Sequence, residues 1–144
     1  MVSMEPEMHP TRLLLADDAA TERAALATYL RREGYEVSEA GNGADAIDYL
    51  KSHEVDALLL DLNMPVVDGF DVLAYLQEHR RALPVIILSG MPVEKIQREI
   101  HLLPQHALPP LMFKPFDPEQ LVQVLELRLA GDLPGQDGQM QANA

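Results

Sequence analysis

The sequence predicts an α/β fold, a doubly wound parallel sheet of five strands with helices on both faces. Three observations lead to it. Short apolar runs of strand length alternate five times with segments of helical periodicity, which is typical of parallel α/β sheets. Three of these runs are apolar without a break, as in strands that are buried on both faces. Residues that begin and end helices stand between the runs.

The strands are predicted at the apolar runs. Residues 13–16, 57–60 and 85–88 are uninterrupted apolar runs and are expected to form buried strands. Residues 35–38 alternate polar and apolar side chains, which suits an edge strand. Residues 111–113 form a shorter fifth run. Five such strands most commonly take the flavodoxin-like order 2-1-3-4-5, which we expect here.

The first three helices are predicted from apolar spacing and from stop residues. Residues 21–33 end at Gly34, and glycine is common directly after a helix. Residues 45–52 and residues 70–79 each place their apolar side chains on one face. Each of these segments follows a predicted strand, so each is expected to return the chain to the start of the next parallel strand.

The last two helices have different signals. The fifth has the clearest start, because Asp117 is a good N-cap, Pro118 suits the first helical position and Gln120 completes a capping box. Four prolines between residues 91 and 110 predict an irregular fourth helix or an irregular loop after it. The fourth helix is indicated by apolar residues three or four positions apart, namely Val93, Ile96, Ile100 and Leu103.

Composition limits the domain organisation and the function. The 144 residues fit one domain, at residues 11–130. Residues 1–10 are expected to be a disordered segment and residues 131–144 a flexible tail or linker, because neither end shows periodicity. A net charge of −12 disfavours direct binding to nucleic acid or to an anionic membrane. The chain has no cysteine and no apolar stretch of membrane-spanning length. These features suit a cytoplasmic protein.

Side chains with useful chemistry follow four of the predicted strands. Sites in open parallel sheets form beyond the carboxyl ends of the strands, so these side chains are expected to converge. A strand-end aspartate alone is more often a turn or helix-cap residue. Agreement among four strand ends favours a functional site. The residues are Asp17 and Asp18 after the first strand, Asp61 after the third, Ser89 after the fourth and Lys114 after the fifth.

The chemistry of this set points to phosphoryl transfer. Three neighbouring carboxylates repel one another unless a cation neutralises them, and oxygen ligands favour Mg²⁺. A carboxylate beside Mg²⁺ can attack phosphorus and form an acyl phosphate. Lys114 can neutralise the phosphoryl oxygens, and Ser89 can donate a hydrogen bond to one of them.

At these positions the sequence resembles the receiver domain of two-component response regulators. The matching segments occur in the family's order and with approximately its spacing. They are residues 14–18 (LLADD), 61–69 (DLNMPVVDG), 88–90 (LSG) and 114–116 (KPF). The resemblance covers about residues 11–130, nearly all of the predicted ordered chain.

The resemblance implies a metal site and a phosphoacceptor. Asp61 would accept the phosphoryl group. Asp18 and Asp61 would bind Mg²⁺ directly, joined by the backbone carbonyl of Asn63. Asp17 would act mainly through metal-bound water. The protein would then be a phosphorelay signalling protein whose only catalysis is its own phosphoryl transfer and dephosphorylation.

The resemblance also implies how phosphorylation is read. Lys114 would contact the phosphoryl group, and Ser89 would reorient towards it. The family often has a switch aromatic three residues before the lysine, where this chain has Leu111. Phe113 is expected to point to the opposite face and not to replace that aromatic. The bond between Lys114 and Pro115 is a candidate for the cis form.

The implied partners are a sensor histidine kinase or a histidine phosphotransfer protein as donor, and a downstream protein that the sequence does not name. The donor is expected to dock near the first helix. No direct contact with nucleic acid or membrane is expected.

Three alternatives stay open. A receiver-fold binding module that ignores phosphate is suggested by Leu111. A phosphohydrolase with an aspartyl phosphate is disfavoured, because Asn63, two residues after Asp61, cannot supply a proton as a general acid. A nucleotide-binding domain is weaker again, since no glycine-rich loop follows the first strand.

Overall fold

The computed structural model describes residues 9–79, 81–100 and 109–131. Within this part of the chain, the strands form one parallel sheet in the order β2-β1-β3-β4-β5, which confirms the predicted topology. The strand order reverses between β1 and β3, so the loops that follow these two strands flank one crevice. The strands are β1 (Arg12–Ala16), β2 (Glu36–Ala40), β3 (Ala57–Asp61), β4 (Val85–Ser89) and β5 (Leu111–Phe113).

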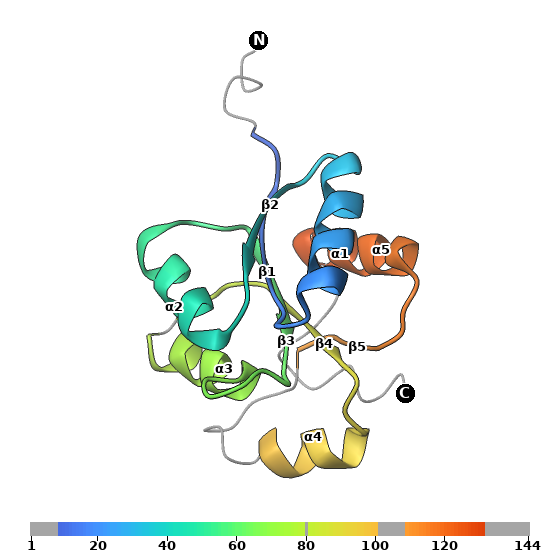
Figure 1. Ribbon diagram of the computed structural model, residues 1–144. Helices are drawn as coiled ribbons and strands as arrows, with labels where there is room; N and C mark the ends of the chain where they lie inside the picture. The colour runs from blue at the N-terminus through green and yellow to red at the C-terminus, as the bar shows by residue number, and fades with distance from the viewer. Residues whose placement is uncertain (1–8, 80, 101–108, 132–144) are drawn as a thin grey trace.

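Helices cover both faces of the sheet (Figure 1). They are α1 (Ala20–Arg32), α2 (Gly43–Ser52), α3 (Gly69–Glu78), α4 (Val93–Ile100) and α5 (Pro118–Leu129). On β1, Leu13 and Leu15 pack against α1 and α5, whereas Leu14 and Ala16 pack against α2 and α3. Because side chains alternate between the faces of a strand, this pattern produces two apolar layers, one on each face of the central strands.

Aspartates cap the first turns of α3 and α5. Asp68 caps α3 through a complete capping box with Asp71, in which each carboxylate accepts the other residue's backbone N–H, at 3.0 and 2.9 Å. Asp117 caps α5 as predicted, but it accepts from the N–H of Glu119 at 3.0 Å. The capping box predicted with Gln120 is therefore wrong, because the Asp117 carboxylate reaches the second helical N–H and not the third.

Two expectations about β5 have different outcomes. The peptide bond between Lys114 and Pro115 is cis, as expected. The expected orientation of Phe113 is wrong, because residues two apart on a strand share a face. Phe113 therefore lies on the face of Leu111, which packs against the α2 and α3 layer, while Phe113 itself is 47% exposed.

Other predictions fall outside the described residues. These are most of the expected disordered segment at residues 1–10, most of the expected flexible tail or linker at residues 131–144, and the part of the proline-rich segment at residues 101–108, including Leu103. Among the helices of the described ranges, none is both long and apolar enough to cross a bilayer.

Candidate functional site

The carboxyl ends of β1, β3 and β5 bring two carboxylates and one ammonium group together. Asp17 directly follows β1, and Asp61 is the last residue of β3. Their side chains are only 4% and 6% exposed. The Nζ of Lys114 lies 3.0 Å from Oδ2 of Asp17 and 3.2 Å from Oδ2 of Asp61. A single ammonium group thus bridges two buried carboxylates from neighbouring strands.

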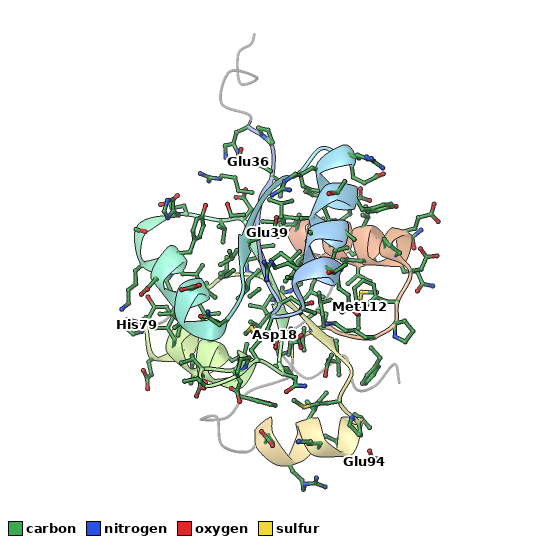
Figure 2. All side chains as sticks on the ribbon, viewed as in Figure 1. Asp18, Glu36, Glu39, His79, Glu94 and Met112 are labelled. Carbon is green, nitrogen blue, oxygen red and sulfur yellow. The ribbon has the colours of Figure 1, made fainter. Side chains whose placement is uncertain are left out.

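Asp18 completes a cluster of three carboxylates. One carboxylate oxygen from each of Asp17, Asp18 and Asp61 lies within 4.8 Å of the others. Asp18 is exposed at this edge of the sheet (Figure 2). All three donors are hard oxygen atoms, and the exposed side leaves room for water ligands. This set fits Mg²⁺, which takes a few carboxylates and keeps several of its waters.

Asn63 lies in the loop after β3. Its backbone N–H donates to Oδ1 of Asp61 at 3.0 Å. Because Lys114 contacts Oδ2, the two oxygens of the Asp61 carboxylate have different partners. The aspartate is therefore held in one orientation at the end of its strand.

The charges in the site are not balanced. Burial raises the pKa of Asp61, and the charge of Asp17 raises it further, although the Asn63 N–H and Lys114 oppose the rise. Burial alone would lower the pKa of Lys114, but its contacts with Asp17 and Asp61 outweigh burial and raise that pKa. Lys114 therefore stays cationic, while the negative charge of Asp61 is disfavoured in the fold. A further cation would relieve this imbalance.

Ser89 lies at the end of β4 and is fully buried. Its Oγ accepts a hydrogen bond from the N–H of Met91 at 2.9 Å. Its carbonyl accepts the N–H of Lys114 at 2.8 Å. Ser89 is thus tied through the backbone to the lysine that contacts Asp61, and its own strand, β4, pairs directly with β3.

Asp17 and Asp18 do not cap helix α1. The residue before α1 is Ala19, and no side chain caps this helix. Asp17 instead accepts the N–H of Ala19 through Oδ1 at 2.9 Å, which closes a tight turn. Asp18 remains exposed to solvent beside Asp61. The ordinary explanation of these aspartates as helix caps is therefore wrong.

Arg23 is a residue at this site that sequence reasoning missed. Its Nη1 donates to the backbone carbonyl of Asp17 at 2.7 Å, and its Nε donates to Oε1 of Glu39 at 3.0 Å. In the sequence Arg23 is one charged residue on the polar side of a helix. Only the packing of α1 beside β2 reveals what its guanidinium contacts.

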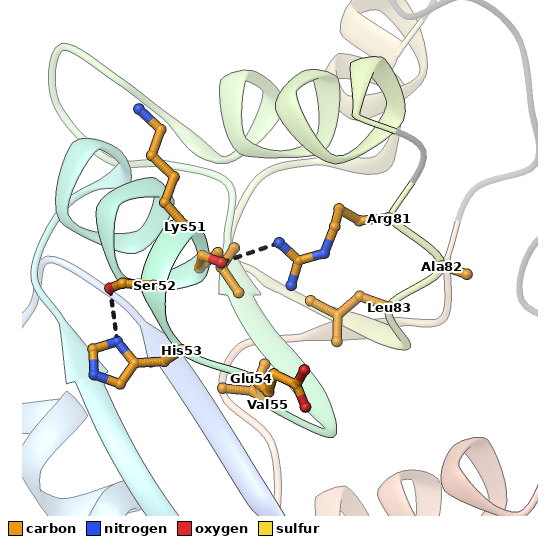
Figure 3. A pocket seen from close by; sticks show the side chains of 9 residues that line it. Lys51, Ser52, His53, Glu54, Val55, Arg81, Ala82 and Leu83 are labelled. Carbon is orange, nitrogen blue, oxygen red and sulfur yellow. Dashed lines mark hydrogen bonds between the residues drawn. The ribbon is translucent and has the colours of Figure 1, made fainter.

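Two of the cavities that described residues line lie towards opposite ends of the central strands. One, of about 700 Å³, reaches from Asp17 and Lys114 along α1 to Phe116. The other, of about 500 Å³, lies beyond the end of α2. In Figure 3 Arg81 reaches across this second cavity to donate to the carbonyl of Leu50 at 3.0 Å. None of the predicted site residues lines the second cavity, so the predicted chemistry belongs to the first end.

Replacing Lys114 with Met is expected to lower the free energy of unfolding by about 2 kcal/mol in Mg²⁺-free buffer. Removing one partner of a buried ion pair costs several kcal/mol, and the 25% exposure of the Lys114 side chain reduces that cost. Urea unfolding measures the change. Lys51→Met, on the exposed surface of α2, is the control. Equal midpoints for Lys114→Met and wild type would contradict this role.

Comparison with known proteins agrees with this geometry. Residues 13–126 match the family model described as the response regulator receiver domain. The chain is 34% identical to the transcriptional regulatory protein PdtaR of Mycobacterium tuberculosis over 122 residues, 84% of this chain and 58% of that protein. It is also 34% identical to the transcriptional regulatory protein ResD of Bacillus subtilis over 118 residues, 81% of this chain and 47% of that protein.

A solved structure is similar to this chain in both fold and sequence. The response regulator receiver protein from Pseudomonas putida is 26% identical, with a TM-score of 0.71, and the match covers 83% of this chain and 98% of that one. This chain spans about half the length of the two regulators above. The family match over most of the chain, the strand order and the carboxylates at the strand ends agree, and the chain belongs to the response regulator receiver domain family.

Proposed function

We propose that residues 11–130 form a receiver module in which Asp61 accepts a phosphoryl group in a Mg²⁺-dependent reaction and thereby switches partner interactions. One observation carries the proposal. The buried Asp61 carboxylate shares Lys114 with Asp17 and lies within 4.8 Å of the Asp17 and Asp18 oxygens. This arrangement holds a nucleophile beside one fixed cation and beside ligands for a second.

In the proposed step, the phosphoryl group passes from a phosphohistidine of the donor to Asp61. One Asp61 oxygen attacks phosphorus of a phosphohistidine, the P–N bond breaks, and the imidazole nitrogen leaves with the electron pair and takes a proton. Asp18, Asp61 and the Asn63 carbonyl would hold Mg²⁺, with Asp17 acting through water, and the metal would neutralise charge on the phosphoryl oxygens. Lys114 would move from Asp61 Oδ2 to a phosphoryl oxygen.

The proposed partners follow from the surface around Asp61. A histidine kinase or a histidine phosphotransfer protein would donate the phosphoryl group, seated near α1, where the 700 Å³ cavity opens beside Lys114. A downstream protein would read the change. The net charge of −12 supports partners other than nucleic acid or anionic membrane, and we place the module in the cytoplasm.

The test uses acetyl phosphate as donor and intact-mass spectrometry as readout. With Mg²⁺, the wild-type protein should gain the mass of one phosphoryl group, and fragmentation should locate it on the peptide that contains Asp61. With EDTA, no gain is expected. A protein that gains no mass with Mg²⁺ would contradict the proposal. Labelling without any change in amide exchange outside the site would favour the phosphate-independent binding module.

A further inference from the structure

The turn that carries Asp17 and Asp18 is held in place by Arg23 of α1. The guanidinium makes two hydrogen bonds from one plane, with Nη1 2.7 Å from the Asp17 carbonyl oxygen and Nε 3.0 Å from Oε1 of Glu39. Glu39 belongs to β2, and in Figure 2 it lies beside α1. Arg23 thus joins three elements, namely the helix that carries it, the acidic turn and the edge strand.

Arg23 contacts Asp17 through the carbonyl oxygen of the peptide bond that joins Asp17 to Asp18. A peptide unit is planar, so fixing its carbonyl oxygen fixes the direction in which the chain enters Asp18. The Asp17 side chain has its own partners, the N–H of Ala19 and Lys114. Asp18 is exposed, and its position follows from the backbone that carries it. Of the three carboxylates, that of Asp18 therefore depends most on Arg23 for its position.

The packing around the guanidinium leaves it little freedom. The Arg23 side chain is only 20% exposed. A β-carbon added at Gly41 would lie 3.1 Å from Nη1, so the glycine leaves space that the guanidinium occupies. The backbone N–H of Asp17 donates to the carbonyl of Ala40 at 3.0 Å, which holds the same turn against the end of β2.

We propose that Arg23 is a positioning residue for the divalent cation, and that its bonds to Asp17 and Glu39 preset the Asp17–Asp18 turn for metal binding. The inference rests on the proposed function, since it assumes that the three carboxylates bind Mg²⁺. Partners that orient a metal ligand typically contribute 10-fold to 100-fold to metal affinity. Arg23 touches no ligand carboxylate, so the lower end of this range is expected.

Charge and positioning predict opposite results for Arg23→Met. Removing a cation near three carboxylates should strengthen Mg²⁺ binding if only charge matters. If positioning matters more, binding should weaken by about tenfold. Arg23→Lys keeps the charge but cannot reproduce the planar two-bond geometry, so it should also bind Mg²⁺ more weakly than wild type. Gly41→Ala, which displaces the guanidinium without removing it, should weaken binding less than Arg23→Met.

Arg31 provides a matched control on the same helix. Its Nη2 donates to the carbonyl of Val37 at 2.8 Å and to Oε2 of Glu39 at 3.2 Å. Arg31 thus joins α1 to the same glutamate and to a β2 carbonyl, but it does not contact the acidic turn. Arg31→Met should leave Mg²⁺ affinity within about twofold of wild type, because Arg31 has no hydrogen bond to the turn that carries Asp17 and Asp18.

The experiment measures Mg²⁺ affinity by titration calorimetry and amide exchange by NMR without metal, on wild type and these variants. The inference expects weaker Mg²⁺ binding and faster exchange at Ala19 in Arg23→Met, with neither change in Arg31→Met. Unchanged or tighter binding in Arg23→Met, or equal losses in Arg23→Met and Arg31→Met, would overturn it. A wild-type protein that binds no Mg²⁺ would contradict the proposed function and, with it, the role of Arg23 in metal binding. Unchanged Ala19 exchange in Arg23→Met would separately contradict the claim that Arg23 holds the turn.

Discussion

An Asp61→Asn variant is expected to gain no phosphoryl mass from acetyl phosphate and, in Mg²⁺-free buffer, to unfold at a higher temperature than wild type. The first result follows because an amide oxygen is too weak a nucleophile to form the acyl phosphate. The second follows because burial, followed by the charge of Asp17, raises the pKa of Asp61. Asparagine has nearly the same shape, and its oxygen can still accept the N–H of Asn63.

The sign of the pH dependence follows from the raised pKa. A carboxyl whose folded-state pKa lies above its unfolded value is stabilising below the unfolded pKa, and this stability is lost as pH rises through the folded pKa. Wild type should therefore be less stable than Asp61→Asn at neutral pH. The difference should narrow as pH falls through the pKa of Asp61 in the folded protein. Mg²⁺ should stabilise wild type more than the variant.

Asp56→Asn is the matched control for this prediction. Asp56 precedes β3 at the other end of the same strand, where it accepts the backbone N–H of Arg12 at 2.7 Å. This variant should be labelled like wild type and should not be stabilised. Differential scanning fluorimetry and intact mass give both readouts on one sample. Labelling of Asp61→Asn to the wild-type extent would contradict the assignment of the phosphoacceptor.

Much of the fold and of the site could be predicted because both follow from short-range patterns. Uninterrupted apolar runs identify strands that are buried on both faces, and the carboxyl ends of parallel strands share one edge. Asp17 and Lys114 are 97 residues apart in the sequence, with Asp61 between them, and this rule alone predicts that the three side chains lie together. Their distances of 3.0 and 3.2 Å agree with that expectation.

What could not be predicted depends on contacts between elements or on backbone angles. The bonds of Arg23 require α1 to lie beside β2, and no local pattern specifies which carbonyl a surface arginine meets. Val66 has a φ of 63° and is 98% exposed. A β-branched residue is rare in the left-handed region, so its side-chain type offers no reason to expect it there. Val66 lies in the loop between β3 and α3, outside any regular element whose backbone angles a sequence pattern could predict.

Gly69 is a position next to the phosphoacceptor where a small substitution should be costly. It begins α3, directly after the Asp68 cap, and its N–H donates to the carbonyl of Leu62 at 3.1 Å. A β-carbon there would lie 2.5 Å from the carbonyl oxygen of Asp61 and 2.6 Å from Cα of Leu62. These contacts are with backbone atoms, which cannot turn aside as a flexible side chain would, so the helix start or the end of β3 must move.

Gly69→Ala is therefore expected to lower the free energy of unfolding by about 3 kcal/mol, the upper end of the usual cost of overpacking. For a chain of this size that change lowers the melting temperature by roughly 10 °C. Urea unfolding should show a lower midpoint with an unchanged slope. Gly90→Ala is the control, because a β-carbon at Gly90 meets no atom within 4 Å.

The same substitution should also slow phosphorylation, because the atoms that the added methyl group would displace include the backbone of the phosphoacceptor itself. Acetyl phosphate labelling of Gly69→Ala, measured well below its melting temperature, should be slower than that of Gly90→Ala by about tenfold or more, since small misplacements of reacting groups cost rate steeply. Equal unfolding midpoints for the two variants would mean that the backbone at the end of β3 moves to accommodate the added methyl group without loss of stability. The close approach of α3 to Asp61 would then have no part in fixing the nucleophile.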